Sequence, residues 1–394
     1  MSLKNNHTLK SGYCATILFF VFWFPQYLRS QTPNTYSVSA WWANTAPAFS
    51  PVVMKTNEII FRIKAPKAQK VELLFGEWNI KPALLSRDTT GVWSIKIGPI
   101  SPGIYSYLFS VDGSRIPDFS NPIVKTGTEI YGSIVEVPGG DKPRFDEIQP
   151  VPHGTLQIYK YSSTPLKILR QLYVYLPPSY YKEPNKKFPV LFLRHGGGDN
   201  ESSWTQESGR AQIILENLIA ANQAVPMIIV MSNGLTDGTW SGGSTKEGIN
   251  DLENELLYDI IPLVESTFRV LPGSHNRSLA GLSMGGGQAY LIGLRHPENF
   301  AWIGEFSSGL LSDAKFDIND RIPGVYSESA VLNKKLKLLF IACGSDDPRF
   351  PGHIALNNML KEKGIRHEEY TLSGGHEWKV WREALRIFMT KLFK

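Results

Sequence analysis

Residues 277–297, RSLAGLSMGGGQAYLIGLRHP, change character halfway along. They begin as an apolar run, turn around Ser283 and continue with the composition of a helix. Gly281 and Gly285 flank the serine in the pattern G-x-S-x-G, and two more glycines follow. Between a strand and a helix this pattern predicts a nucleophile elbow, whose strained backbone exposes the hydroxyl and leaves no room for a Cβ at the flanking positions.

This turn has two other interpretations. A glycine-rich turn with an idle serine is the simpler alternative. A nucleotide-binding loop is disfavoured, because no lysine stands where a phosphate loop requires one and no acidic signal follows a Rossmann-type turn. A helix that begins after the turn would also place its N-terminus beneath the serine, where it favours negative charge. We therefore interpret Ser283 as a catalytic nucleophile.

A serine hydroxyl needs a base, and elbows of this kind place the histidine late in the chain, after an acid. Four of the eight histidines follow the serine: His296, His353, His367 and His376. The first three stand at the end or start of predicted helices and strands, where capping or packing roles are usual. His376 lies in LSGGHEWKVW, a glycine-bearing loop between the last predicted strand and the final helix. We predict it to be the general base.

The acid that orients this histidine is expected at the end of the preceding strand. The segment LKLLFIACGSDDPRF offers Asp346 and Asp347 there. Either carboxylate could fix the tautomer of the imidazole and stabilise its cationic form. From position alone, both remain candidates.

An oxyanion hole is the remaining requirement of acyl chemistry. The segment LRHGGGDNESSW follows an apolar strand, and its glycines let backbone N–H groups approach a substrate. The N–H of Met284, together with that of Gly196 or, by preference, Gly197, would hold the carbonyl oxygen. His195 is expected to brace this loop and Trp204 to pack under or beside the pocket.

The two halves of the chain differ in their pattern of apolar and polar residues. Residues 31–137 contain short alternating strands with Gly, Pro and Asp between them, including the hairpin turn Asp112-Gly113, and predict a small all-β sandwich. Residues 138–152 are rich in Pro and Gly and are interpreted as a linker. In 153–394 strand-like and helix-like runs alternate, which predicts an α/β domain with a doubly wound, largely parallel sheet.

Residues 1–30 combine a basic start with a short apolar run, which predicts a cleaved signal peptide and a secreted or periplasmic protein without a membrane anchor. Its removal would lower the formal charge from +5 to +2 and leave Cys343 as the only cysteine. A nearly neutral chain without a dense basic stretch does not suggest nucleic-acid binding. No His/Cys/carboxylate motif calls for a metal, and no cofactor is expected.

The first half resembles the immunoglobulin-like modules related to the N-terminal domains of glycogen-branching enzymes (CBM48-like). The resemblance rests on GVWSIKI, GIYSYLFSVDG and PDFSNP. It implies either a brace for the following domain or a carbohydrate-binding module, with bracing preferred.

The second half resembles the esterase-D-like α/β-hydrolases of carbohydrate esterase family 1. The motifs are HGGGDNESSW, VMSNG, ELLYDIIPLVESTFRV, LAGLSMGGGQA, CGSDDP and GGHEWKVWREAL. The resemblance implies a triad of Ser283, Asp347 and His376, because the fourth position of Gly-x-x-Asp is the acid. It also implies oxyanion donors at Met284 and at Gly196 or Gly197. Arg194 departs from the apolar or neutral residue expected before HGGG.

The order of the two halves resembles that of bacterial feruloyl esterases, which implies release of hydroxycinnamates from arabinoxylan. Acetyl-xylan esterases, trilactone siderophore esterases and mycolyltransferases are related alternatives, and a non-catalytic polysaccharide-binding protein is a rival from another class. Trp240, Leu310 and Tyr326, in the loops 231–248 and 307–329, are candidate pocket residues.

Overall fold

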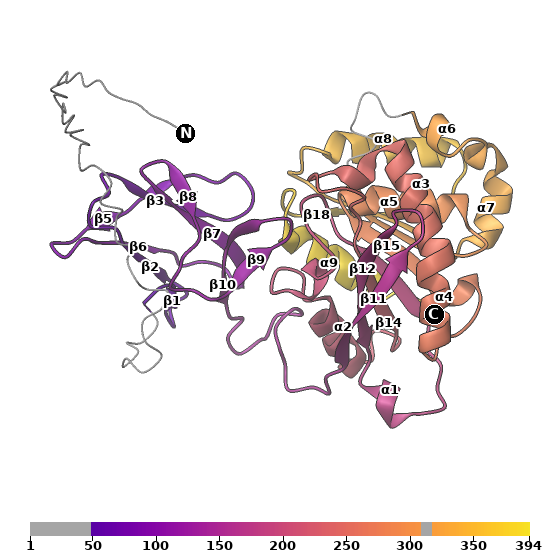
Figure 1. Ribbon diagram of the computed structural model, residues 1–394, viewed down its shortest axis with the longest axis horizontal. Coiled ribbons are helices and arrows are strands. Elements are labelled where there is room, and N and C mark those ends of the chain that lie inside the picture. The colour runs from indigo at the N-terminus through magenta and orange to yellow at the C-terminus, as the bar shows by residue number, and fades with distance from the viewer. Residues whose placement is uncertain (1–48, 309–316) are drawn as a thin grey trace, which may run out of the picture. The chain divides into compact units, whose positions relative to one another are not determined.

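The computed structural model describes residues 49–308 and 317–394 (Figure 1). The predicted signal segment and Leu310 lie outside these residues. Within the described ranges, no helix is both long and apolar enough to cross a lipid bilayer.

Two antiparallel sheets form the N-terminal part of the described chain, at the indigo-to-purple end of the colour bar in Figure 1. One sheet has the order β1-β2-β6-β5, and the other has the order β4-β3-β7-β10-β9 with β8 paired to β7. Their strands are β1 (Val52–Val53), β2 (Ile59–Lys64), β3 (Val71–Phe75), β4 (Ala83–Leu84), β5 (Ser86–Arg87), β6 (Val92–Ile97), β7 (Gly103–Val111), β8 (Ser114–Ile116), β9 (Val124–Thr126) and β10 (Ile130–Val137). We call this part the N-terminal sandwich.

The sandwich is held together by one apolar core to which both sheets contribute. Alternate residues of β2 and β6 meet alternate residues of β3 and β7, and Phe61 and Tyr107 stack edge to face with ring centroids 4.7 Å apart. Period-two alternation places every second side chain on the inner face, which is why the strands could be read from the sequence. The turn Asp112-Gly113 joins β7 to β8, with Val111 paired to Ser114.

An eight-stranded sheet forms the core of the remaining chain, in the order β11-β12-β14-β13-β15-β16-β17-β18. Its strands are β11 (Thr155–Ser163), β12 (Ile168–Leu176), β13 (Val190–Arg194), β14 (Ile228–Ser232), β15 (Arg277–Leu282), β16 (Trp302–Phe306), β17 (Leu338–Gly344) and β18 (Glu368–Leu372). From β14 to β18 the neighbours are parallel, as predicted. The other edge is antiparallel, and β11 was not foreseen, because half of its side chains face solvent as in an edge hairpin.

The helices cover both faces of this sheet. Along β13, Phe192 belongs to one buried cluster while Leu191 and Leu193 belong to the other, so the two clusters lie on opposite faces. Helices α3, α4, α5 and α8 contribute to the first cluster, and α2 and α9 to the second. The helices and helical turns are α1 (Ser179–Lys182), η1 (Ser203–Thr205), α2 (Ala211–Ala220), η2 (Gly242–Ser244), α3 (Lys246–Asn254), η3 (Glu255–Ile260), α4 (Ile261–Thr267), η4 (Ser274–Asn276), α5 (Met284–Arg295), α6 (Ile318–Arg321), η6 (Val325–Glu328), α7 (Ser329–Lys335), α8 (Phe350–Glu362) and α9 (Trp378–Met389).

The strand order decides which loops meet. Strand β13 pairs with β15 so that Arg194 stands opposite Gly281, and β16 and β17 follow in parallel on the other side of β15. The loops after β13, β15, β17 and β18 therefore all begin at the carboxyl ends of the parallel strands. Ligand sites of such sheets form beside these carboxyl ends.

Candidate active site

Ser283 stands alone between β15 and α5, with φ 51° and ψ −118°. A non-glycine residue in this left-handed region is strained, and the strain is held by the surrounding hydrogen bonds. The Ser283 N–H donates to the Phe306 carbonyl at 2.7 Å, and the Ser283 carbonyl accepts the Gly287 N–H at 3.1 Å. The turn therefore has the geometry of the predicted elbow.

The glycines beside the serine are required by contact with neighbouring backbone. A Cβ on Gly281 would lie 2.5 Å from the carbonyl carbon and oxygen of Gly285. A Cβ on Gly285 would lie 2.2 Å from the His195 carbonyl oxygen. The elbow is thus packed directly against the loop that follows β13, which brings the nucleophile close to the glycines predicted to form the oxyanion hole.

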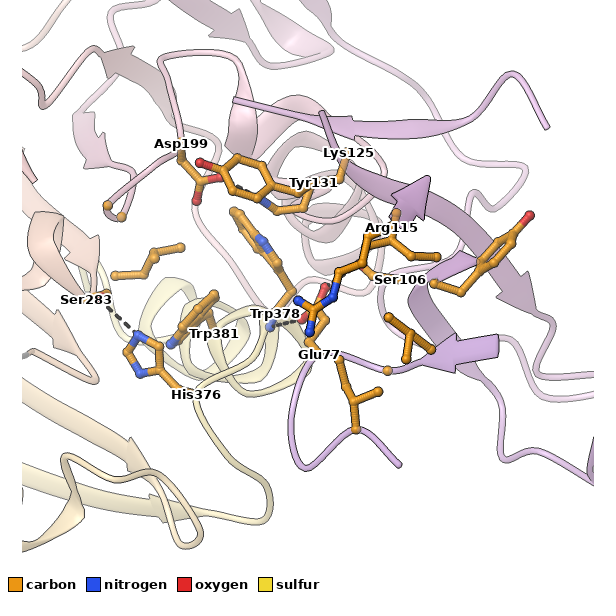
Figure 2. Close-up of a pocket in the computed structure, with 18 of the residues that line it drawn as sticks. Glu77, Ser106, Arg115, Lys125, Tyr131, Asp199, Ser283, His376, Trp378 and Trp381 are labelled. Atoms are coloured by element: carbon orange, nitrogen blue, oxygen red, sulfur yellow. Dashed lines mark hydrogen bonds and ion pairs between the residues drawn. The ribbon is translucent and has the colours of Figure 1, made fainter. Parts of the chain in front are cut away.

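Three side chains that are far apart in the sequence form a hydrogen-bonded chain. Ser283 Oγ lies 3.0 Å from His376 Nε2, and His376 Nδ1 lies 2.8 Å from Asp347 Oδ2. Figure 2 shows the first of these contacts at one end of the pocket. The tautomer that carries its proton on Nδ1 donates to Asp347 and leaves Nε2 free to take the hydroxyl proton. Such an arrangement can activate a serine for attack on an acyl carbon.

The two adjacent aspartates are in different environments. Asp347 is buried and accepts the Arg349 N–H at 2.9 Å in addition to the His376 contact, whereas Asp346 is exposed. Burial by itself would raise the pKa of Asp347, but its hydrogen bond with His376 and the charge of that ring outweigh burial and hold the pKa below its usual value. Asp347 is therefore ionised at neutral pH and faces the histidine.

A second carboxyl group lies behind the first. Glu305, in β16, is 3% exposed, and its Oε1 accepts the Ser308 N–H. Burial, reinforced by the negative charge of Asp347, raises the pKa of Glu305 to about 8. Glu305 is therefore mostly neutral at pH 7, which avoids placing two charged carboxylates side by side in the interior.

The backbone N–H groups proposed for the oxyanion hole are available. Gly196 and Gly197 line the cavity together with Ser283, and Met284 is the first residue of α5. Among the described residues, the N–H groups of Met284, Gly196 and Gly197 donate to no protein acceptor. A carbonyl oxygen at the elbow would find unused donors there.

His195 holds the peptide that joins the two glycines. Its Nε2 accepts the Gly234 N–H at 2.7 Å, so the proton is on Nδ1, which donates to the Gly196 carbonyl at 2.8 Å. Burial lowers the pKa of His195 and keeps the ring neutral. Because the Gly196 carbonyl is fixed, the N–H of Gly197 on the same planar peptide is fixed as well.

Ser283 and His376 open onto a cavity of about 480 Å³. Its aromatic walls come from the α/β domain, with Trp240 from the loop after β14 and Trp378 and Trp381 from α9. The ring of Trp381 meets that of His376 edge to face, with centroids 4.9 Å apart. The N-terminal sandwich also lines the cavity, through Glu77, Ile80, Ser106, Arg115, Lys125 and Tyr131 among others (Figure 2).

The remaining predicted pocket residues fall in different places. Trp240 lines the cavity, whereas Trp204 does not: it is 1% exposed and donates its indole N–H to the Arg194 carbonyl beneath the loop. Leu310 lies outside the described residues, and Tyr326 belongs to η6, with its side chain outside the described part. Trp204 therefore supports the loop from beneath and is not part of the cavity wall.

Arg194, the unexpected residue before the glycine loop, is buried and does not line the cavity. Burial lowers its pKa to about 10, so the guanidinium remains charged at pH 7. Its guanidinium nitrogens lie 3.4 Å from Gln288 Oε1 in α5 and 3.3 Å from the Leu252 carbonyl oxygen in α3, so Arg194 links these two helices. It adds no charge to the cavity wall.

Sequence reasoning missed the sandwich residues in the wall. Lys125, Tyr131 and Arg115 lie in short strands whose pattern indicates only a sandwich, and no local signal predicts which edge meets the catalytic loops. Trp378 and Trp381 stand in the histidine loop motif and could have been singled out as aromatic neighbours of His376. Over the described ranges, no three metal-ligating side chains gather in one place.

Comparison with known proteins supplies the family. A family model described as "Putative esterase" matches residues 163–389, which is more than half of the chain. The endo-1,4-beta-xylanase/feruloyl esterase of Xylanibacter ruminicola is 32% identical over 352 residues, covering 87% of this chain and 46% of that protein. This chain thus spans about half the length of that relative.

Two solved structures are similar as well. A ferulic acid esterase shares 25% identity at a TM-score of 0.54, over 60% of this chain and 97% of its own. The enterobactin esterase FES of Shigella flexneri shares 18% identity at a TM-score of 0.64, over 84% of this chain and 92% of its own. The second likeness concerns the fold alone. By the family match, the chain belongs to the esterase family.

Proposed function

We propose that this chain is a serine esterase that releases hydroxycinnamates such as ferulate from the arabinoxylan of plant cell walls. The observation that carries the proposal is the hydrogen-bonded chain Ser283–His376–Asp347 at the edge of an aromatic cavity. The similarity to a ferulic acid esterase and to a xylanase/feruloyl esterase supports the choice of acyl group.

In the first stage, His376 Nε2 takes the proton of Ser283 as Oγ attacks the ester carbonyl carbon. The carbonyl oxygen becomes negative and is held by the N–H groups of Met284 and Gly197, each worth a few kcal/mol by analogy with other oxyanion holes. The carbon–oxygen bond to the alcohol then breaks, and His376 returns its proton to the departing sugar hydroxyl. An acyl group remains bonded to Oγ.

In the second stage, water enters and His376 takes one of its protons. The hydroxide attacks the acyl carbon, and Oγ leaves with the proton from His376, which frees the acid and restores the serine. Asp347 stays ionised throughout and stabilises the imidazolium in both stages. The planar tryptophan walls of the cavity suit a flat aryl acid.

A second candidate substrate is a catecholate trilactone. It is favoured by the likeness to the enterobactin esterase, which extends over 84% of this chain where that to the ferulic acid esterase covers 60%. Arg115 in the cavity wall would also suit the acidic hydroxyls of catechols. Acetylated xylan is a third possibility within the same chemistry.

Hydrolysis of methyl ferulate, acetylated xylan and a catecholate trilactone by the same enzyme preparation tests the proposal. We expect kcat/KM to be highest on the ferulate, and Ser283→Ala to abolish it while the exposed control Ser345→Ala does not. Turnover of the trilactone alone would remove the polysaccharide proposal and leave the serine mechanism. We also propose that residues 1–30 direct export, which N-terminal sequencing of the mature protein would test.

A further inference from the structure

The tip of one sandwich hairpin lies against the loop that carries the predicted oxyanion donor. The hairpin is formed by β9 and β10, and the loop is the glycine-rich segment 196–200 after β13, here called the oxyanion loop. The Gly198 carbonyl accepts the Thr128 N–H at 2.8 Å, the Thr128 hydroxyl at 3.1 Å and the Tyr131 hydroxyl at 3.0 Å. The two hydroxyls also lie 2.8 Å from each other, so the sandwich holds the Gly198 carbonyl through the Thr128 N–H and at least one of the two hydroxyls.

An ion pair joins the same two segments one residue further along. Lys125 Nζ contacts Asp199 Oδ1, and the side chains are 12% and 5% exposed. The ammonium also lies 4.5 Å from the centre of the Tyr131 ring. Figure 2 shows Lys125 and Tyr131 next to Asp199 at the cavity wall. A pair this well buried is screened less by solvent than a surface pair, so breaking it leaves an uncompensated charge.

The hairpin and the oxyanion loop lie so close together that each has a glycine at the contact. A Cβ on Gly127, in the hairpin, would lie 2.2 Å from the Gly198 carbonyl oxygen. A Cβ on Gly198, whose φ is +74°, would lie 2.3 Å from the Tyr131 hydroxyl. On its other side the Gly198 N–H donates to the Trp240 carbonyl at 2.8 Å. The hairpin and the oxyanion loop thus pack closely against each other at Gly127 and Gly198.

These contacts enclose the donor that the mechanism uses. The Gly196–Gly197 peptide is fixed from the α/β side by His195, and the Gly198 carbonyl, two residues further on, is fixed from the sandwich side by Thr128 and Tyr131. The N–H of Gly197 belongs to the first of these two peptides, and a single peptide separates it from the second. An oxyanion hole acts only if its donors stand about 2.7–3.1 Å from the oxygen that becomes negative, so a displacement of a few tenths of an ångström weakens it.

The sandwich also contacts the loop that carries the base. The Glu77 carboxylate accepts the N–H of Trp378, the first residue of α9, at 2.8 Å, and the Trp78 ring packs on Gly375, where a Cβ would lie 2.3 Å from it. These contacts fix the start of the helix that follows His376. The loop with the predicted donors Gly196 and Gly197 and the loop with the base are therefore both in contact with the sandwich.

We propose that the N-terminal sandwich positions the oxyanion hole, with Tyr131, Thr128 and Lys125 as positioning residues. The proposal rests on the serine mechanism given above. It makes the sandwich part of the catalytic unit for every ester, including esters too small to reach the sandwich. A sandwich that only binds polysaccharide would affect polymeric substrates alone.

The test uses the full-length enzyme and 4-nitrophenyl acetate, whose acyl group is two carbons long. We expect Tyr131→Phe and Lys125→Met each to lower kcat about ten-fold with KM within two-fold of the wild type, because the donors are displaced. Thr128→Val should do the same and Thr128→Ser should restore the rate. Tyr105→Phe is the matched control, since its hydroxyl bonds only the Ser101 carbonyl within the sandwich.

A boronic acid inhibitor supplies a second readout, because its tetrahedral adduct on the serine places an oxygen in the oxyanion hole. Its Ki should rise in parallel with the loss of kcat/KM, while the Tm of Tyr131→Phe, which leaves no charge unpaired, stays within about 2 °C. Unchanged acetate turnover in all three variants, with loss on feruloylated xylan only, would overturn the positioning role and leave the esterase proposal standing. Absence of ester hydrolysis by the wild type would overturn both.

Discussion

The carboxylate of Asp347 lies 2.8 Å from Nδ1 of His376, although 29 positions separate the two residues in the sequence. The contact forms because β17 and β18 are parallel neighbours whose following loops leave the same edge of the sheet. One loop carries the acid and the other carries the base. The adjacent Asp346 points to solvent, so backbone geometry selects one of two chemically identical side chains.

Replacing Asp347 should reveal this selection. In Asp347→Asn the amide can no longer stabilise the imidazolium, and we expect kcat on methyl ferulate to fall about 10³–10⁴-fold, by analogy with other triads. Asp346→Asn, one residue away, should stay within two-fold of the wild type. Steady-state kinetics of the two variants check this. Equal losses in both would show that the acid is assigned to the wrong carboxylate.

Replacing the ionisable carboxyl group of Glu305 should change how the stability of the protein depends on pH. Its folded pKa, about 8, is above the unfolded value near 4.3, so its contribution is fully present below pH 4 and is lost as pH rises through 8. Glu305→Gln keeps an acceptor for the Ser308 N–H and cannot ionise. We expect the variant's free energy of unfolding, relative to the wild type, to increase by at least about 1 kcal/mol from pH 5 to pH 8.

Urea unfolding at the two pH values measures this difference. The exposed Glu328→Gln is the control and should show no comparable change. A pH-independent difference for Glu305→Gln would mean that the buried carboxyl is ionised at pH 7 and compensated in some other way.

The glycines of the elbow should tolerate no side chain. Gly285 lies in the first turn of α5, where alanine normally stabilises a helix by about 1 kcal/mol. The Cβ of Gly285→Ala would meet the His195 carbonyl at 2.2 Å, and overpacking against fixed backbone costs about 1–3 kcal/mol or more. The clash outweighs the helix propensity, so we expect net destabilisation and a loss of kcat of at least about ten-fold.

Thermal unfolding and steady-state kinetics on methyl ferulate check this prediction. Gly238→Ala is the control, because an added Cβ there meets no atom within 4 Å. Wild-type stability and activity in Gly285→Ala would show that the elbow and the oxyanion loop can separate without cost.

The parts of this molecule that could be predicted are those with local causes. Alternation with period two marks the strands β2, β3, β6 and β7, and the glycines around Ser283 mark a turn that other residues cannot adopt. The base could be reached by chain order, because only a few histidines follow the serine. The strands and the turn need only a window of about ten residues. The base needs the order of residues along the chain and a known chemical requirement.

The parts that could not be predicted depend on contacts between distant segments. Tyr131 and Gly198 are 67 positions apart, and nothing in either segment indicates the other. The indole of Trp204 turns under the loop because the Arg194 carbonyl accepts its N–H, a choice that the sequence leaves open. Edge strand β11 was missed since its exposed side chains weaken the apolar signal.

Labelling by a fluorophosphonate, followed by peptide mass spectrometry, tests the catalytic serine most directly. Such a reagent bonds only to a serine whose proton a neighbouring base removes. We predict one adduct per chain, on Ser283, with activity lost in proportion to labelling and almost no labelling of His376→Ala. A stoichiometric adduct on any other residue, or full ester hydrolysis after Ser283 is blocked, would contradict the mechanism.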